Sequence, residues 1–132
     1  MAFSLLRSRP MRDHRGFTLI EVLLVIVLLG VLSGIAIAQY ESFRARGLDA
    51  RVASVVRHVA TGEEAYFASR QRYTTDVDAL DVSIDDVGIT ITAGNSGDLG
   101  SSFRVSGSHP GAKQTWTWLS DPVPGEPNLI AG

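Results

Sequence analysis

One acidic side chain lies inside a long apolar segment near the start of the chain. The segment "HRGFTLIEVLLVIVLLGVLSGIAIAQY" runs from His14 to Tyr40 and carries Glu21 five residues after Gly16. A carboxylate in hydrocarbon is costly when it is ionised, and an unpaired neutral acid is costly there as well. A positively charged partner would remove most of this cost. We therefore expect Glu21 to have a partner.

The other residue types that could do chemistry favour no catalytic or metal site. The chain contains no cysteine, which excludes a disulfide framework, a thiolate metal site and a cysteine nucleophile. His14, His58 and His109 are far apart in the sequence, and Asp121 and Glu126 are separated by prolines. We therefore expect no enzyme activity, no cofactor and no metal, calcium included. A run of acids is interpreted as a solvated surface, with weak cation binding as the alternative: Asp76, Asp78, Asp81, Asp85 and Asp86.

The charge is distributed unevenly along the chain. The whole sequence has 12 Lys+Arg and 14 Asp+Glu side chains. Residues 1–16 hold four of the arginines and only one acid, so the remainder has 8 basic and 13 acidic side chains and a net charge of −5. An acidic body argues against general nucleic-acid binding through phosphate contacts. The basic N-terminal segment is typical of a flank that stays on the cytoplasmic side of a membrane.

The apolar residues 17–38 are long enough to cross a bilayer. As a helix they would rise about 33 Å at ~1.5 Å per residue, close to the ~30 Å hydrocarbon core. Gly30 and Gly34, with Ser33, place small residues on one side of this helix. Small residues let helices approach closely in membranes, so we expect helix packing at Gly30 and Gly34; local flexibility is the alternative.

Residues 39–69 continue as an amphipathic helix. Apolar residues recur at three- and four-residue steps, which predicts one face packed on a core, and no proline interrupts the sequence between Met11 and His109. The expected apolar stripe comprises Leu48, Val52, Val55, Val56, Val59, Tyr66 and Phe67. The expected polar surface comprises Arg44, Arg46, Asp49, Arg51, Arg57, Glu63 and Glu64. Tyr40, Phe43 and Tyr73 are expected to be packing residues.

Three alternating runs after residue 86 predict an antiparallel sheet at about 87–120. They are "VGITITA", "SSFRVSG" and "KQTWTWL", separated by turn-forming segments. One face would pack on the helix and the other would meet water. Trp116 and Trp118 would share a face and belong to the core, with an exposed patch as the alternative. The loop before the sheet would hold a short turn at Val77 to Leu80, and the proline-rich tail would be extended. The fold class is α+β: one long N-terminal helix on a small antiparallel sheet.

Two simpler interpretations of the apolar segment remain open at this point. A secretory signal peptide would use "AIAQ" as its cleavage site and be cut after Ala38. Its apolar core is usually 7–15 residues, which is shorter than this segment. A single membrane anchor fits the length and flanks, but it leaves Glu21 unexplained.

The residues from Arg15 to Tyr40 closely resemble the N-terminus of type IV pilins and type II secretion pseudopilins. The resemblance includes the Gly–Phe junction, the "FTLIE" run, Gly30 and the closing "IAQY", and it extends more loosely through "EEAYFASRQRYTTDVDAL". Many members have a proline where this chain has Ala38, and many close the C-terminal region with a disulfide.

The resemblance implies a processing and assembly route. Residues 1–16 would be a leader that a prepilin peptidase removes between Gly16 and Phe17, whether translation starts at Met1 or Met11. The new amine of Phe17 would be methylated. Glu21 would then pair with the Phe17 amine of a neighbouring subunit in a helical polymer.

The resemblance also implies partners and a location. Residues 17–38 would lie in membrane lipid before assembly and in the filament core afterwards, and residues 39–132 would form a periplasmic or extracellular globular domain. An inner-membrane platform protein and a cytoplasmic ATPase would drive assembly, and no specific nucleic acid is expected. The leading hypothesis is a structural subunit of a type IV pilus. The alternatives are a pseudopilin of a type II secretion system and a secreted binding domain.

Overall fold

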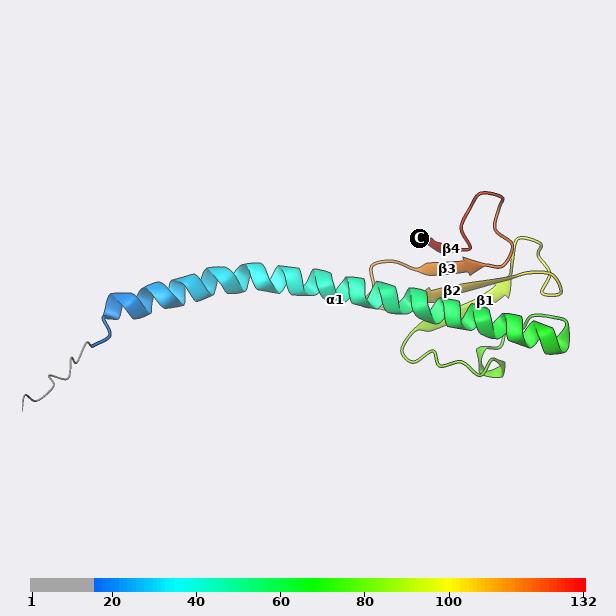
Figure 1. The fold of residues 1–132 in the computed structure, drawn as a ribbon, viewed down its shortest axis with the longest axis horizontal. Helices are drawn as coiled ribbons and strands as arrows, with labels where there is room; N and C mark the ends of the chain where they lie inside the picture. The colour runs from blue at the N-terminus through cyan, green and yellow to red at the C-terminus, as the bar shows by residue number, and fades with distance from the viewer. Residues whose placement is uncertain (1–15) are drawn as a thin grey trace, which may run out of the picture. The chain divides into compact units, whose positions relative to one another are not determined.

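The computed structural model describes residues 16–132, which form one long helix and a four-stranded sheet (Figure 1). The expected leader lies outside the described residues except for Gly16. By its internal contacts the chain divides into two units, Met1–Ile37 and Ala38–Gly132. The α+β class expected from the sequence is confirmed.

Helix α1 runs from Leu19 to Arg70 and is 52 residues long. It ends where Gln71 adopts a left-handed conformation with φ of 56°. The N–H of Gln71 donates to the carbonyl of Phe67 at 2.8 Å, which satisfies one of the last helical acceptors. Arg70 in the last turn places a positive charge at the negative end of the helix dipole.

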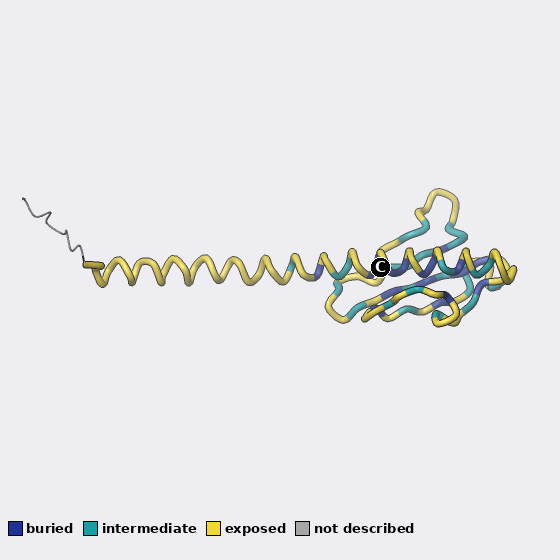
Figure 2. The backbone as a smooth tube through the Cα atoms, turned by 60° about the horizontal axis from the view of Figure 1, so that its bottom comes forward, coloured by how far each residue is buried: buried dark blue, intermediate teal, exposed yellow. Residues whose placement is uncertain are grey.

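The first half of α1 is apolar on every side and has no packing partner in the part of the chain that the structure describes. The large apolar side chains from Phe17 to Ile37 are between 45% and 82% exposed, as Figure 2 shows along the helix. The helix is long and apolar enough to cross a membrane. A helix that is hydrophobic all round is stable only inside a bilayer or a bundle of other helices.

The second half of α1 supplies the core of the C-terminal unit. Val52, Val56 and Val59 are fully buried, as the three- and four-residue spacing predicts. Small residues that the apolar stripe did not include are buried with them, namely Ala45, Ala53 and Ala60. Tyr40 and Phe43 were expected to pack, but they are 68% and 64% exposed. The expectation was wrong for these two side chains because the core begins only after them.

The sheet is antiparallel with strand order β1-β2-β3-β4. Its first three strands are Gly88–Ala93, Phe103–Ser108 and Trp116–Leu119. The fourth, Leu129–Ala131, pairs with β3 and was not expected, because the tail was predicted only to be extended. A three-residue strand after three prolines is too short to show an alternating pattern.

One face of the sheet packs on α1. Phe103 and Val105 of β2 are fully buried, and Trp116 and Trp118 of β3 pack against the same cluster, as expected. Gly107 lies where β2 approaches the helix most closely, since an added Cβ there would collide with a methyl group of Val56. The other face is polar, and Ser106 and Thr117 of adjacent strands share a hydroxyl hydrogen bond of 3.1 Å.

The loop between α1 and β1 is fixed by a short 3-10 turn, η1, at Val77–Ala79. The side chain of Asp76 caps this turn by accepting from the N–H of Asp78 at 3.1 Å. Leu80, directly after the turn, is buried in the core. The turn expected at Val77 to Leu80 is therefore present, and it lies beside the last turns of α1.

Glu63 was assigned to the polar surface of the helix, and this assignment was wrong. Its side chain is fully buried. One carboxylate oxygen accepts from the N–H of Thr74 at 3.0 Å, while Oε1 has no hydrogen-bond partner among the described residues. Burial raises the pKa of Glu63, the Thr74 hydrogen bond opposes this, and the charge of Glu64 adds to the rise.

The buried carboxylate makes the stability of the C-terminal unit depend on pH. Because the pKa of Glu63 is raised in the folded state, its contribution is fully present below the unfolded value of about 4.5 and is lost as the pH rises through the folded value. Glu63→Gln keeps an acceptor for Thr74 and cannot ionise. We expect this variant to be about 1 kcal/mol or more stable than the wild type at pH 8 and close to it at pH 4.

Thermal unfolding of the full chain in detergent, followed by tryptophan fluorescence, measures this difference. Glu41→Gln is the control, because Glu41 is an exposed acid on the same helix. An equal pH slope for wild type and Glu63→Gln would show that the Glu63 carboxylate does not cause the dependence.

Candidate functional site

Thr18 caps the start of α1 and places Glu21 in its first turn. The N–H of Glu21 donates to the Thr18 hydroxyl at 3.3 Å and to the Thr18 carbonyl at 3.1 Å. The sequence Thr18–Leu19–Ile20–Glu21 has the spacing of a capping box. A carboxylate in the first turn is also stabilised by the positive end of the helix dipole. The local structure therefore favours an acid at this position before any partner is considered.

Gly16 and Phe17 lie directly before this cap and are exposed. Phe17 is 74% exposed, and an added Cβ at Gly16 would meet nothing within 4 Å. Neither packing nor a left-handed backbone requires glycine at position 16. In the uncleaved chain the nitrogen of Phe17 belongs to a peptide bond, so the expected pair between Glu21 and a Phe17 amine stays a prediction.

Gly30 and Gly34 are one helical turn apart on one face of α1. Added Cβ atoms would meet nothing within 4 Å at either position. Each glycine costs the helix roughly 1 kcal/mol relative to alanine. The described residues therefore give no packing reason for these two glycines, and a close contact with another helix would supply one.

The most extensive ionic cluster in the C-terminal unit joins α1 to two loops. The guanidinium of Arg51 lies 3.1 Å from Asp85 and 2.9 Å from Asp86. Asp86 also contacts Nε2 of His109 at 3.1 Å, while Nδ1 of His109 accepts from the N–H of Gly111 at 2.9 Å. Since Nδ1 accepts, Nε2 carries the proton and donates to Asp86. The arrangement fixes the loops and leaves no free ligand set.

The same contacts lower the pKa of Asp86. Desolvation alone would raise it, but the hydrogen bonds from its own N–H and from His109, together with the charge of Arg51, lower the pKa below its usual range. Asp86 therefore stays ionised as the partner of Arg51 and His109. This gives a structural role to one of the acids that were interpreted as a solvated surface, with weak cation binding as the alternative.

Asp121 binds backbone groups of the loop between β1 and β2. Its two carboxylate oxygens accept from the N–H groups of Asn95 at 3.0 Å and Ser96 at 2.9 Å. The Asn95 hydrogen bond is the main reason that the pKa of Asp121 is lowered, against a smaller opposing effect of burial. A carboxylate surrounded by N–H donors holds a loop and is not arranged to bind a cation.

The remaining candidates do not come together in the structure. His14 lies outside the described residues, His58 is exposed on α1, and His109 is paired with Asp86. Within residues 16–132 no group of three or more His, Asp or Glu side chains is placed to hold a metal ion.

Sequence reasoning missed the helix cap and the loop contacts of the acids. The T-x-x-E spacing after Phe17 could have revealed the Thr18 cap, because it is a recognised N-terminal signal. The contacts of Asp86 and Asp121 join residues 23 and 26 positions apart, so no local pattern could have revealed them.

The same N-terminal segment matches a known family of sequences. Residues 11–37 match the prokaryotic N-terminal methylation motif. This match covers the Gly16–Phe17 junction, Glu21, Gly30 and Gly34, which are the positions singled out above.

Curated relatives extend the similarity beyond the motif. The type IV major pilin protein PilA of Myxococcus xanthus is 33% identical over 67 residues, covering 51% of this chain and 30% of the relative. A fimbrial protein of Pseudomonas aeruginosa is 30% identical over 101 residues, covering 76% of this chain and 65% of the relative. The type IV major fimbrial protein FimA of Dichelobacter nodosus is 26% identical over 126 residues, covering 80% and 81%.

The alignments cover less than two thirds of the Myxococcus and Pseudomonas relatives' own lengths. They nevertheless combine the methylation motif with similarity that continues into the C-terminal unit, and the fold is one long N-terminal helix on a small antiparallel sheet. The motif, the relatives and the fold together support the type IV pilin family as the family of this chain.

Proposed function

We propose that the protein is a structural subunit of a type IV pilus. The observation that carries this proposal is the apolar half of α1, whose large side chains are exposed on all sides within a single chain. Lipid can cover this surface before assembly, and the same surface of other copies can cover it in a fibre. One surface then serves two environments, so a subunit can be stored in the inner membrane and added to an extracellular filament.

Cleavage between Gly16 and Phe17 would prepare the subunit for assembly. A prepilin peptidase that needs a small residue before the cut would account for Gly16, where an added Cβ meets no described atom within 4 Å. The cut releases an amine at Phe17, next to the Thr18 cap, and the same enzyme would methylate it. An inner-membrane platform protein and a cytoplasmic ATPase would supply the work of extraction from the membrane.

Glu21 would then control which subunits can join. The new amine lies at the positive end of its own helix dipole, where a second positive charge is unfavourable. The Glu21 carboxylate of a neighbouring copy can neutralise it and is neutralised in turn. Removing one partner of a buried ion pair typically costs ~3–5 kcal/mol. The pair therefore favours one register between neighbours.

Surface fibres and their N-terminal peptide test the proposed function directly. We expect this chain to be the bulk component of fibres sheared from cells, with Phe17 as its first residue and a methyl group on its amine. Mass spectrometry of the purified fibres measures both properties. A first residue of Gln39 would support the secreted domain instead, and a trace amount in fibres would support a minor or pseudopilin role.

Replacing Glu21 tests the charge pair. Glu21→Ala keeps the Thr18 cap, because the cap uses the backbone N–H of residue 21. We therefore expect normal cleavage and a fall in fibre yield of about 100-fold or more. The measurement is the ratio of fibre-bound to membrane-bound subunit by immunoblot.

Glu41→Ala is the control for the loss of a negative charge, since Glu41 is exposed and lies outside the apolar half. Wild-type fibre yield from the Glu21→Ala strain would eliminate the pairing mechanism while leaving the filament proposal intact.

Larger side chains at Gly30 or Gly34 test close helix packing. Gly30→Leu and Gly34→Leu should raise helix propensity by roughly 1 kcal/mol, so a single chain gains stability. Leucine would nevertheless hold neighbouring helices apart, and we expect fibre yield to fall while membrane insertion and cleavage stay normal. Val31→Leu is the control, because residue 31 is already large. Unchanged yield from both glycine variants would refute a packing role.

A further inference from the structure

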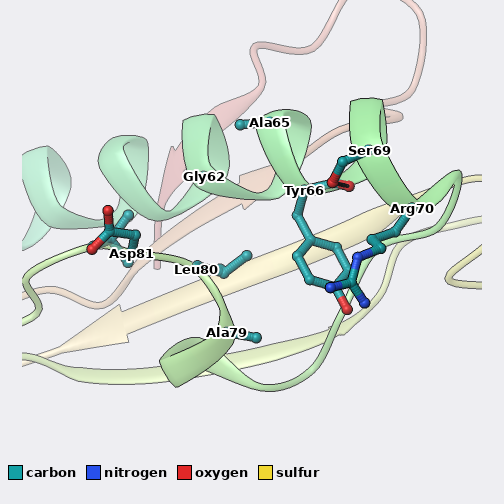
Figure 3. Close-up of a pocket in the computed structure, with 9 residues that line it drawn as sticks. Gly62, Ala65, Tyr66, Ser69, Arg70, Ala79, Leu80 and Asp81 are labelled. Atoms are coloured by element: carbon teal, nitrogen blue, oxygen red, sulfur yellow. Dashed lines mark hydrogen bonds between the residues drawn. The ribbon is translucent and has the colours of Figure 1, made fainter.

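A groove runs between the last turns of α1 and the segment that follows η1 (Figure 3). It has a volume of about 350 Å³. Gly62 forms part of its floor because an added Cβ there would lie 3.0 Å from a methyl group of Val82. The residues that line the groove include Gly62, Ala65, Arg70, Leu80, Asp81 and Val82.

The two ends of the groove carry opposite charges. Figure 3 shows Arg70 at one end and Asp81 at the other, with Tyr66 between them. The Arg70 guanidinium lies 5.5 Å from the centre of the Tyr66 ring and is exposed, so it remains available to a partner. The groove therefore suits a segment that places an apolar side chain on the floor formed by Gly62 and Ala65 and an acidic side chain beside Arg70.

The loop between β3 and β4 presents a segment of this kind. The N–H of Glu126 donates to the carbonyl of Val123 at 2.9 Å, and Gly125 has φ of 95°. With Pro124 at its second position and Gly125 at its third, the segment has the signature of a type II turn. Val123 is 55% exposed, the most exposed large apolar side chain among the described residues after α1.

The turn can reach from the floor of the groove to Arg70. The ends of a four-residue turn are less than about 7 Å apart. Ala65 and Arg70 both line the groove, and five residues on a helix correspond to a rise of about 7.5 Å and a rotation of about 140°. The Arg70 side chain offsets this rotation, because its guanidinium lies over the Tyr66 ring, which also lines the groove. Val123 can therefore lie over Ala65 while Glu126 reaches the Arg70 guanidinium, and this orientation keeps Glu126 away from Asp81.

The turn and the groove of one chain cannot meet. The turn joins β3 to β4, which forms one edge of the sheet, whereas the groove adjoins the loop that leads into β1 at the opposite edge. In Figure 1 the two loops extend from opposite sides of α1. The turn must therefore dock on another molecule if it docks on such a groove.

We propose that the Val123–Glu126 turn of one subunit docks in this groove of the next, with Val123 on the Gly62–Ala65 floor and Glu126 paired with Arg70. The proposal rests on the proposed function, because it adds a contact between globular units to the packing of the apolar helices. Groove and turn are different surfaces, so the contact is heterologous and repeats along an open helical filament. One turn buries too little area to hold two free subunits together, so the contact forms within the fibre.

Cysteine cross-linking tests the docking directly, because the chain has no cysteine of its own. In fibres of the double variant Ala65→Cys/Val123→Cys, mild oxidation should produce a ladder of covalent multimers on a non-reducing gel. Each single variant should remain monomeric. The pair Ser108→Cys/Val123→Cys is the control, since Ser108 is exposed on β2 away from the groove.

Reversed charges test the ion pair. Arg70→Glu and Glu126→Arg should each lower fibre yield about two- to fivefold, and the double variant should restore it. Arg72→Glu controls for a reversed charge at the end of α1. Normal fibres that give no ladder and no rescue would overturn the docking and leave the pilus proposal standing. No fibres from the wild-type chain would overturn both.

Discussion

The rest of the structure depends on one unsatisfied surface: a helix half that is apolar on every side and packs on no other element among residues 16–132. Large side chains from Phe17 to Ile37 remain at least 45% exposed. Water is a poor solvent for such a surface, so lipid or other copies must cover it. As proposed, the alternation between these two environments would let one sequence be a membrane-anchored subunit first and a filament subunit afterwards.

The residues at the start of the helix determine how specifically other helices can pack on this apolar surface. Leucine, isoleucine and valine pack in many registers at similar cost, whereas an acid in an apolar surface tolerates few. Thr18 holds Glu21 in the first turn, where the helix dipole already favours a negative charge. The helix dipole offsets only part of the cost of a negative charge in an apolar environment. A cation from outside the helix is needed to offset the rest of that cost. In the proposed filament, the Phe17 amine of a processed neighbour would supply this cation.

Local patterns predicted the parts of the fold that local physics decides. The valine stripe of α1, the three alternating strands and the turn at Val77 all follow from periodicity or turn chemistry, and all are present. The candidate site at Glu21 was visible because one acid in an apolar run needs no tertiary information. Glu63 was misjudged because its burial depends on Thr74, which returns over the helix end only in three dimensions. The short strand β4 was missed for a similar reason, since pairing with β3 defines it.

The exposed turn and groove of the C-terminal unit fit the same proposed assembly. Apolar helix packing is strong but weakly directional, so a fibre held by it alone would permit sliding and rotation of its subunits. Directional contacts at separate places on the subunit remove that freedom, because a single helical repeat must satisfy all of them. The proposed charge pair at Glu21 would constrain the apolar halves, and the proposed docking of the Val123–Glu126 turn would constrain the globular units. The contact between turn and groove can be weak individually, since the proposed filament would repeat it at every subunit and a misplaced copy would lose it together with the charge pair.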